Sequence, residues 1–180
     1  MIWFIADTHF GHESIIDLCG RPFKDAGDME TFMIKAWNER VRGDDTVFIL
    51  GDMFFKHKDP ERVLKLLKGK KRLIVGNHDG TWISDPALAK YFATVEPYAE
   101  FSDGKRKPVL FHYPLVTWNH EAKSYMIHGH IHNSTDGDYW SIIKNNPRIL
   151  NAGADINGFC PVTFEQLQVN NERFKNGSLQ

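Results

Sequence analysis

Short apolar runs that end in glycine, acidic residues or histidine recur along this chain. Residues 73–75 form one such run, and Gly76-Asn77-His78-Asp79 follows it directly. A run of this length between turn-forming residues is typical of a buried strand. The same pattern recurs where residues 2–6 lead into Asp7-Thr8-His9, 47–50 into Gly51-Asp52, 109–111 into His112, and 125–127 into the segment 128–132. Because ligands of open α/β sheets collect at the carboxyl ends of strands, the pattern predicts one site built from five strand ends.

Segments with helical spacing or helix-start signals separate these runs. The clearest begins at Asp59-Pro60-Glu61, which combines a capping side chain, a proline at the first position and an acid in the first turn, and Gly69 closes it. Further helices are expected at residues 13–18, at 29–41 with Asp28 as the cap, at 85–92 and at 163–174. Residues 94–101 and 107–112 are expected to pair as a hairpin, 133–138 to form a polar loop and 148–151 a further strand. The alternation of strands and helices indicates an α/β fold.

The composition is that of one globular domain, which we expect to span residues 1–180. Hydrophobic residues make up 42% and charged residues 25% of the chain, the usual balance of a globular protein. The net charge of −1 gives no strong nucleic-acid-binding signal, and no pattern indicates an obligate protein partner. Cys19 and Cys160 have no CxxC spacing, which fits a reducing compartment. No apolar run approaches the roughly 18 residues of a membrane span, so we expect a cytoplasmic protein without membrane association.

Metal-binding side chains are concentrated at the five strand ends. They are Asp7, His9, Asp52, Asn77, His112, His130 and His132. Carboxylate, imidazole and amide groups together suit divalent ions of borderline or harder character, and the absence of thiolates argues against a closed structural zinc site. Seven ligands are too many for one ion but fit two ions that share a carboxylate. Two ions about 3.5–4 Å apart are a common device for activating water against a phosphoester.

The order of these motifs resembles that of the calcineurin-like metallophosphoesterases. The family pattern of Asp-x-His, Gly-Asp, Gly-Asn-His-Asp/Glu, His and Gly-His-x-His is matched in full from Asp7 to His132. The resemblance is to small single-domain members of bacterial and phage type. It implies an α/β fold in which two mixed β-sheets, flanked by helices, form a four-layer α-β-β-α sandwich.

The resemblance also implies a distribution of the ligands over two metal ions. One ion would bind Asp7, His9, Asp52 and His132, and the other would bind Asn77, His112, His130 and the shared Asp52. We expect Mn²⁺ in both positions, with Fe, Zn, Ni, Co or Mg as alternatives. Two divalent ions, two carboxylates and a bridging hydroxide give +4 − 2 − 1, a net charge of about +1 that attracts a phosphate.

Two residues are expected to be catalytic. Asp52 would hold the hydroxide-bearing ions together, so that the bridging hydroxide attacks phosphorus. The resemblance implies that His78 stays off the metals and either stabilises phosphate charge or protonates the leaving oxygen. Calcineurin-type protein phosphatases have an acid that orients this histidine where the present chain has Phe55. Asp79 is the candidate replacement, and protein phosphatase activity is not expected.

Other residues are candidates for contact with the substrate. Asn77 and His78 are expected to reach the phosphate. His12 would either contact phosphate or cap a helix, and Arg21 would either bind phosphate with two nitrogens or form a surface salt bridge. The remaining histidines are expected to be structural or to support the ligands: His57, His120 and His128.

These observations favour a binuclear metal-dependent phosphoester hydrolase, most specifically a phosphodiesterase acting on nucleotide-type substrates. Its loops at residues 10–21, 53–58 and 118–121 should form an open cleft, in which Phe54, Phe55 and Trp118 would either stack a base or pack in the core. One alternative is a phosphomonoesterase acting on small phosphorylated metabolites or nucleotides. A second is a non-catalytic binding module of the same fold, against which the complete set of ligands argues.

Overall fold

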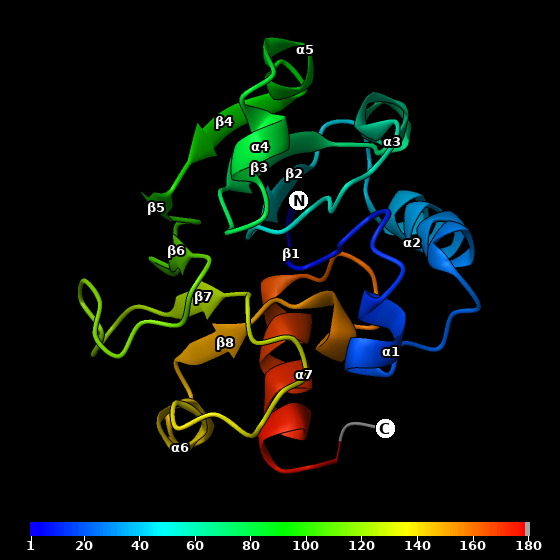
Figure 1. Ribbon diagram of the computed structural model, residues 1–180. Coiled ribbons are helices and arrows are strands. Elements are labelled where there is room, and N and C mark those ends of the chain that lie inside the picture. Colours follow the sequence, from blue (N-terminus) through cyan, green and yellow to red (C-terminus); the bar gives the residue numbers. More distant parts are fainter. Residues whose placement is uncertain (179–180) are drawn as a thin grey trace.

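The first of two four-stranded sheets contains three of the five strands expected from the apolar runs, at residues 2–6, 47–50 and 73–75, together with a fourth strand. A computed structural model, which describes residues 1–178, places them in the order β1-β2-β3-β4, and every neighbouring pair is parallel. These strands are β1 (Ile2–Ile5), β2 (Thr46–Ile49), β3 (Lys70–Ile74) and β4 (Phe92–Glu96). Parallel order brings the carboxyl ends of β1, β2 and β3 to the same edge of the sheet (Figure 1).

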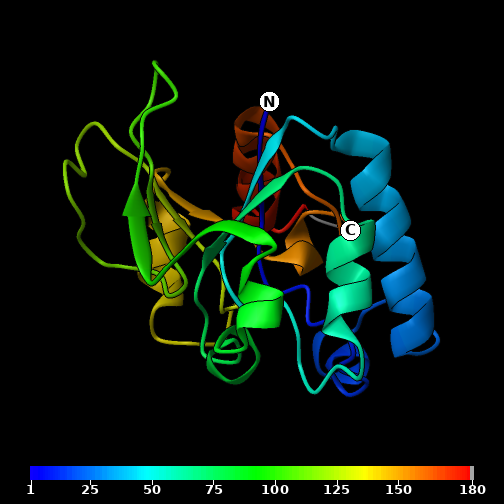
Figure 2. The same ribbon diagram turned by 90° about the horizontal axis from the view of Figure 1, so that it is seen from above.

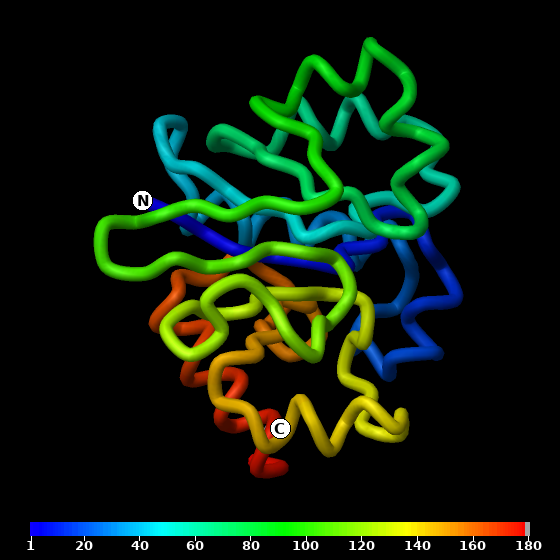
Figure 3. Tube along the Cα trace, turned by 90° about the vertical axis from the view of Figure 1, so that its left-hand side faces the viewer, coloured from blue at the N-terminus to red at the C-terminus, as the bar shows by residue number. Residues whose placement is uncertain are grey.

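The second sheet is mixed and has the order β5-β6-β7-β8. Its strands are β5 (Tyr98–Glu100), β6 (Val109–Phe111), β7 (Met126–His128) and β8 (Ile149–Asn151). β5 pairs antiparallel with β6, whereas β6, β7 and β8 run parallel. The hairpin that connects β5 to β6 extends from one edge of the molecule as the green loop in Figure 3.

Alternation of side chains along the strands explains how the layers stack. Trp3 and Ile5 of β1 join the core beneath the helices α2 and α3, while Phe4 between them joins the core that also contains residues of β6, β7 and β8. Successive side chains of a strand point to opposite faces, so one strand contributes to two cores. Figure 2 shows α2 and α3 lying side by side along one face. A third core lies between the second sheet and α6, which completes the expected helix-sheet-sheet-helix sandwich.

Five of the seven α-helices in residues 1–178 overlap the expected segments, with ends that differ by up to three residues. The seven are α1 (Ile15–Cys19), α2 (Ala26–Arg40), α3 (Pro60–Leu66), α4 (Gly80–Ile83), α5 (Pro86–Ala89), α6 (Trp140–Asn145) and α7 (Phe164–Lys175), with a short 3₁₀ turn at Ala154–Ile156. The start of α3 at Asp59 is confirmed, since its carboxylate accepts the Arg62 N–H. Among residues 1–178, no helix is long and apolar enough to cross a membrane.

Three expectations about the elements need correction. Helix α2 begins at Ala26 and is capped by Asp25, whose carboxylate accepts the N–H of Asp28, so the expected cap lies inside the helix. The extended arm expected at residues 94–101 is divided between the two sheets at Pro97, which has no N–H to continue a ladder. Helices α4 and α6 were not expected, because they are only 4 and 6 residues long and bury little apolar surface.

Candidate metal centre

Backbone hydrogen bonds hold the ligand-bearing loops against one another. The loops after β1 and β2 are joined by Asp7 N–H to Gly51 carbonyl and His9 N–H to Asp52 carbonyl, both at 3.0 Å. The loops of the two sheets are joined because the His130 N–H donates to the Asp7 carboxylate at 2.9 Å. Strand ends that are far apart in the sequence therefore converge on one site.

The backbone at this site is strained. Eight non-glycine residues among residues 1–178 have positive φ, and five of them are predicted ligands: Asp7, His9, Asp52, His130 and His132, with φ from 51° to 70°. Such conformations cost about 1–3 kcal/mol each and cluster at functional sites, where the surrounding structure enforces them. The concentration of strain at the predicted ligands marks these loops as functional.

Two glycines allow the loops to approach closely. A Cβ at Gly129 would lie 2.5 Å from Asp7 Oδ2 and 2.7 Å from the Ala6 Cβ. Gly51 has φ +88°, and a Cβ there would collide with the His112 ring. The glycines of the Gly-Asp and Gly-His-x-His motifs are therefore required by the packing of the ligands themselves.

The ligand atoms form two adjoining groups. Asp52 Oδ2 lies 3.8 Å from His9 Nε2 and 3.5 Å from His112 Nε2. Asn77 Oδ1 lies 3.0 Å from both His112 Nε2 and His130 Nδ1. The groups Asp7-His9-His132 and Asp7-Asp52-His112 each have ligand atoms within 4.8 Å of one another.

A ring nitrogen of His9 that lacks a hydrogen-bond partner indicates whether these groups fit a cation. His9 Nε2 is buried and has no hydrogen-bond partner among the described residues, a situation that costs about 1–3 kcal/mol. It faces the Asp52 carboxylate across 3.8 Å. A divalent ion would satisfy a neutral imidazole and a carboxylate at once, so the residues present fit a metal.

Charges in the cluster favour a bound cation. Burial raises the pKa of Asp7 to about 7 and lowers the pKa of His9 to about 2. Burial also raises the pKa of Asp52, but the hydrogen bond and positive charge of His112 outweigh it and hold that pKa at about 2. Asp52 is thus an anion and His9 a neutral imidazole, the forms that bind metals, while a nearby cation would ionise Asp7 fully.

Hydrogen bonds from the other ring nitrogen orient three of the histidines. His112 Nδ1 donates to the Leu50 carbonyl at 2.7 Å, which directs Nε2 into the cluster. His132 Nδ1 lies 2.9 Å from Asp155 Oδ2, and His9 Nδ1 lies 3.3 Å from His12 Nδ1. Such outer partners fix the ring orientation of metal-binding histidines.

Comparisons with known proteins agree with this geometry. The family model described as calcineurin-like phosphoesterase matches residues 1–168. The chain belongs to this family. It is therefore a metal-dependent phosphoester hydrolase, and the expected fold of two sheets flanked by helices is confirmed.

Relatives of this phosphoesterase come from archaea, phages and bacteria. It is 32% identical to the uncharacterized protein MJ1445 of Methanocaldococcus jannaschii over 167 residues, which cover 91% of this chain and 87% of the relative. It is 28% identical to the Gene 66 protein of Mycobacterium phage D29, over 86% of this chain and 87% of that protein. The crystal structure of AQ665, a protein of unknown function from Aquifex aeolicus, matches 94% of this chain and 98% of its own with a TM-score of 0.74 and 27% identity.

Asp155 is a part of the site of this phosphoesterase that the sequence pattern did not indicate. It lies in the 3₁₀ turn after β8, and its carboxylate holds both His132 and the guanidinium of Arg21. Burial lowers the pKa of His132, but the bond to Asp155 outweighs burial and raises that pKa to about 10. A metal bound at His132 would therefore displace a proton. An acid shortly after a sixth strand end was the available signal, although three residues separate it from β8.

Arg21 fits neither of its expected roles. Its side chain is buried, and it donates to Asp155 through Nε at 2.8 Å and Nη2 at 3.0 Å. The same guanidinium donates to the backbone carbonyls of Asp7 at 2.8 Å and Thr8 at 3.0 Å. Arg21 therefore ties the first ligand loop to Asp155. It forms no surface salt bridge, and its buried N–H groups are all occupied, which leaves none to bind phosphate.

Replacing Arg21 with alanine is expected to lower the free energy of unfolding by about 3–5 kcal/mol, because the buried Asp155 carboxylate would keep only His132 as a partner and two backbone carbonyls would lose their donor. Urea denaturation measures the change. Lys35→Ala is the matched control, since it removes a cation from an exposed pair with Glu39 and should change stability by less than about 1 kcal/mol. Equal stability of the two variants would contradict a structural role for Arg21.

Asp79 does not orient His78. Its buried carboxylate accepts the backbone N–H groups of Asp52, Met53 and Gly76 at 2.8–3.0 Å, as well as the Trp82 indole N–H. The expectation that Asp79 replaces the missing acid is wrong, because these bonds occupy it in holding the loops after β2 and β3 together.

His78 is poised beside the cluster and remains accessible. Its side chain is 39% exposed, and its Nε2 lies 3.9 Å from Asp52 Oδ2. The backbone N–H of His78 donates to Asp52 Oδ1 at 2.8 Å. The ring packs edge-on against Phe55, with centroids 5.0 Å apart. The imidazole of His78 can thus reach a substrate oxygen that lies between it and the predicted metal ligands.

The remaining histidines separate into two kinds. His12 stacks on Phe55 with ring centroids 3.9 Å apart, and it caps no helix because the cap of α1 is Ser14. Its contact with phosphate stays a prediction. His57 pairs with Glu30 at 2.6 Å and His128 is fully buried, which agrees with structural roles. His120 is exposed.

A cavity of about 660 Å³ adjoins the cluster at Asn77 and His78. We call it the side pocket, and its other lining residues include Phe54, Phe55, Lys56, Gly80, Thr81 and Trp82. Of the three aromatic residues expected to stack a base, Phe54 and Trp118 are buried in the core and Phe55 is half-buried. Only Phe55 of these three can present a ring surface near His78.

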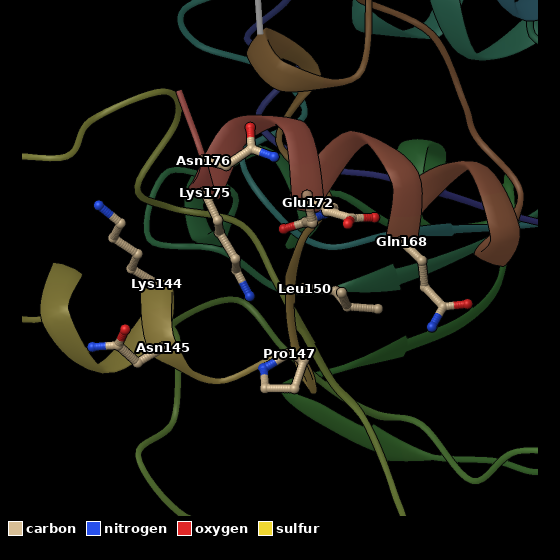
Figure 4. Close-up of a pocket in the computed structure, with 9 residues that line it drawn as sticks. Lys144, Asn145, Pro147, Leu150, Gln168, Glu172, Lys175 and Asn176 are labelled. Atoms are coloured by element: carbon tan, nitrogen blue, oxygen red, sulfur yellow. The ribbon is translucent and has the colours of Figure 1, made fainter. Parts of the chain in front are cut away.

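A second cavity, of about 780 Å³, lies among α6, β8 and α7 (Figure 4). None of the predicted ligands lines it. The Lys175 ammonium that points into it already donates to the carbonyls of Asn146 and Ile149 at 2.7 and 2.6 Å. The chemistry of the phosphoesterase is therefore assigned to the cluster beside the side pocket.

Proposed function

We propose that this phosphoesterase binds two divalent ions and hydrolyses phosphodiesters of nucleotide type. One ion would be held by Asp7, His9, Asp52 and His132, and the other by Asp52, Asn77, His112 and His130. The observation that carries the proposal is the position of Asp52 Oδ2, which lies within 4 Å of both His9 Nε2 and His112 Nε2. A carboxylate in that position can bridge two ions.

The metal ions would supply charge and an activated water. Divalent ions bound to this cluster would lower the pKa of the water they hold and offset the negative charge of the phosphate. The mixed carboxylate, amide and imidazole ligands favour Mn²⁺. Because Asn77 is neutral, the loaded site keeps a net charge of about +1.

Residues of the chain itself would position the reacting groups. Asp52 Oδ1 accepts the backbone N–H of His78 at 2.8 Å, which holds the imidazole beside the cluster. His78 would donate a proton to the departing ester oxygen. His12 would orient His9 through the contact between their Nδ1 atoms at 3.3 Å and could also meet a phosphate oxygen, since its ring is half-exposed at the same face as Phe55.

Preference for diesters is supported by charge and by room. A diester carries a single negative charge, which matches the net charge of about +1. The side pocket gives a substituent of the phosphate space beside His78.

The two free cysteines, Cys19 and Cys160, support action in a reducing compartment such as the cytoplasm.

With Mn²⁺, the protein is expected to hydrolyse bis-p-nitrophenyl phosphate with a higher kcat/KM than p-nitrophenyl phosphate, and 2′,3′-cyclic nucleotides more efficiently than 5′-mononucleotides. Steady-state kinetics on both pairs measures the preference. Metal-free protein prepared with a chelator is the control and should be inactive. A clear preference for the monoester in both pairs would assign the protein to the phosphomonoesterases instead.

A further inference from the structure

The side pocket has the size and lining of a site for an organic group. Its volume of about 660 Å³ lies within the roughly 300–1,000 Å³ of small-molecule sites. Trp82 and Phe55 contribute half-buried rings, and the Trp82 indole is held in place by its hydrogen bond to Asp79 at 3.0 Å. A rigid aromatic lining is suited to a flat ring, because stacking loses little side-chain freedom.

The position of His78 indicates which group on phosphorus would occupy the side pocket. Its Nε2 faces Asp52 across 3.9 Å, while its ring packs edge-on against Phe55 of the side pocket. His78 therefore lies on the border between the cluster and the pocket. A proton donor on this border reaches the ester oxygen that connects phosphorus to a group inside the pocket, so the group in the pocket is the one that leaves.

Lys56 adds a positive charge at the same place. It lines the side pocket, its Nζ lies 5.3 Å from the Phe55 ring centroid, and it forms no salt bridge with any residue of the described chain. A free ammonium next to aromatic rings favours a ligand that combines a flat ring with negative charge. Nucleotides have this combination.

We propose that the side pocket binds the nucleoside that leaves from phosphorus, so that the substrates are nucleotide esters cleaved on the nucleoside side. This inference rests on the proposed function of the cluster. In the reaction, a water oxygen forms the new bond to phosphorus and the bond between phosphorus and the nucleoside oxygen breaks. That oxygen takes its proton from His78, which regains a proton from solvent, while the proton lost by water passes to solvent.

The methyl ester of thymidine 5′-monophosphate tests this direction in one molecule. Methanol and the thymidine 5′-hydroxyl are leaving groups of similar basicity, so the products report the geometry of the site. Thymidine bound in the side pocket gives thymidine and methyl phosphate, whereas the reverse orientation gives thymidine 5′-monophosphate and methanol. We expect the first pair in roughly 5- to 150-fold excess, the factor that corresponds to stacking of one base.

Two glycines provide a variant and its matched control. Gly80 lines the side pocket, Gly43 lies in the connection between α2 and β2, and at both an added Cβ would meet no atom within 4 Å. Neither has positive φ. Gly80→Leu should therefore fill the pocket, and Gly43→Leu should change only the surface.

The proposal requires that the product ratio falls towards one in Gly80→Leu and is retained in Gly43→Leu. An unchanged ratio in Gly80→Leu, or thymidine 5′-monophosphate as the main product of the unmodified protein, would overturn it. If the Mn²⁺-loaded protein hydrolyses neither this ester nor bis-p-nitrophenyl phosphate, the proposed function is wrong. Binding of thymidine then tests the pocket assignment separately. Saturation-transfer NMR should then detect thymidine on the unmodified protein and on Gly43→Leu but not on Gly80→Leu; equal signals would overturn the pocket assignment.

Discussion

Replacing His78 with alanine is expected to lower turnover on nucleotide diesters by roughly 10²–10⁴-fold, the range for a positioned proton donor. His78 makes no side-chain hydrogen bond within residues 1–178 and lies 3.9 Å from Asp52 Oδ2, so its imidazole is available to a substrate. Metal content should stay unchanged, because the metal ligands are assigned to other residues. Steady-state kinetics and elemental analysis of the variant measure both effects.

The dependence on the leaving group identifies what His78 contributes. A p-nitrophenolate scarcely needs protonation, whereas a ribose oxygen does, so the loss should shrink on p-nitrophenyl esters. His120→Asn is a suitable control, because His120 is exposed and has φ 55°, a conformation that asparagine tolerates. Equal losses on both kinds of ester would indicate stabilisation of phosphate charge instead of proton donation.

Asp52→Asn is expected to lower turnover by more than about 10²-fold, which is a larger loss than Asp7→Asn should cause. Residues that only orient metal ligands already contribute 10–100-fold, and Asp52 Oδ2 stands between His9 and His112 at 3.8 and 3.5 Å. The proposed bridge would serve both ions, whereas Asp7 is assigned to one. Kinetics and metal analysis of the two variants under identical Mn²⁺ loading measure the difference.

Asp7→Asn serves as the matched comparison, since both substitutions remove one charge and keep the shape of a buried side chain. An asparagine at position 52 can still accept the N–H of His78 through its Oδ1, so the loop should keep its conformation. Circular dichroism should show both variants folded. Near-normal turnover with two bound metals in Asp52→Asn would mean that Asp52 is not the bridge.

The strands and the strand-end residues were predictable because both depend on local pattern. Short apolar runs predict buried strands, and parallel strands bring their carboxyl ends together, so the convergence of Asp7, Asp52 and Asn77 follows from the topology of the first sheet. The β4–β5 division at Pro97 was readable in principle from the missing N–H. The left-handed backbone of the predicted ligands could not be read from residue type, because most histidines and aspartates have negative φ.

The supporting residues were less predictable, because their roles depend on contacts distant in sequence. Arg21 meets Asp155 across 134 positions, and no local feature distinguishes this buried pair from a surface arginine. Asp79 is adjacent to His78, yet its carboxylate turns to the backbone of the loop after β2. Adjacency in sequence therefore did not predict where the Asp79 side chain points. The sequence likewise did not decide between stacking and packing for Trp118, which packs in the core.

Titration of metal-free protein with Mn²⁺ tests the binuclear centre most directly. Bound metal is counted by elemental analysis at each addition, and hydrolysis of bis-p-nitrophenyl phosphate is measured on the same samples. The arrangement of ligand atoms around Asp52 predicts saturation at about two equivalents per chain, with full activity reached only as the second equivalent binds. Saturation at one equivalent with full activity would contradict a site in which Asp52 bridges two ions.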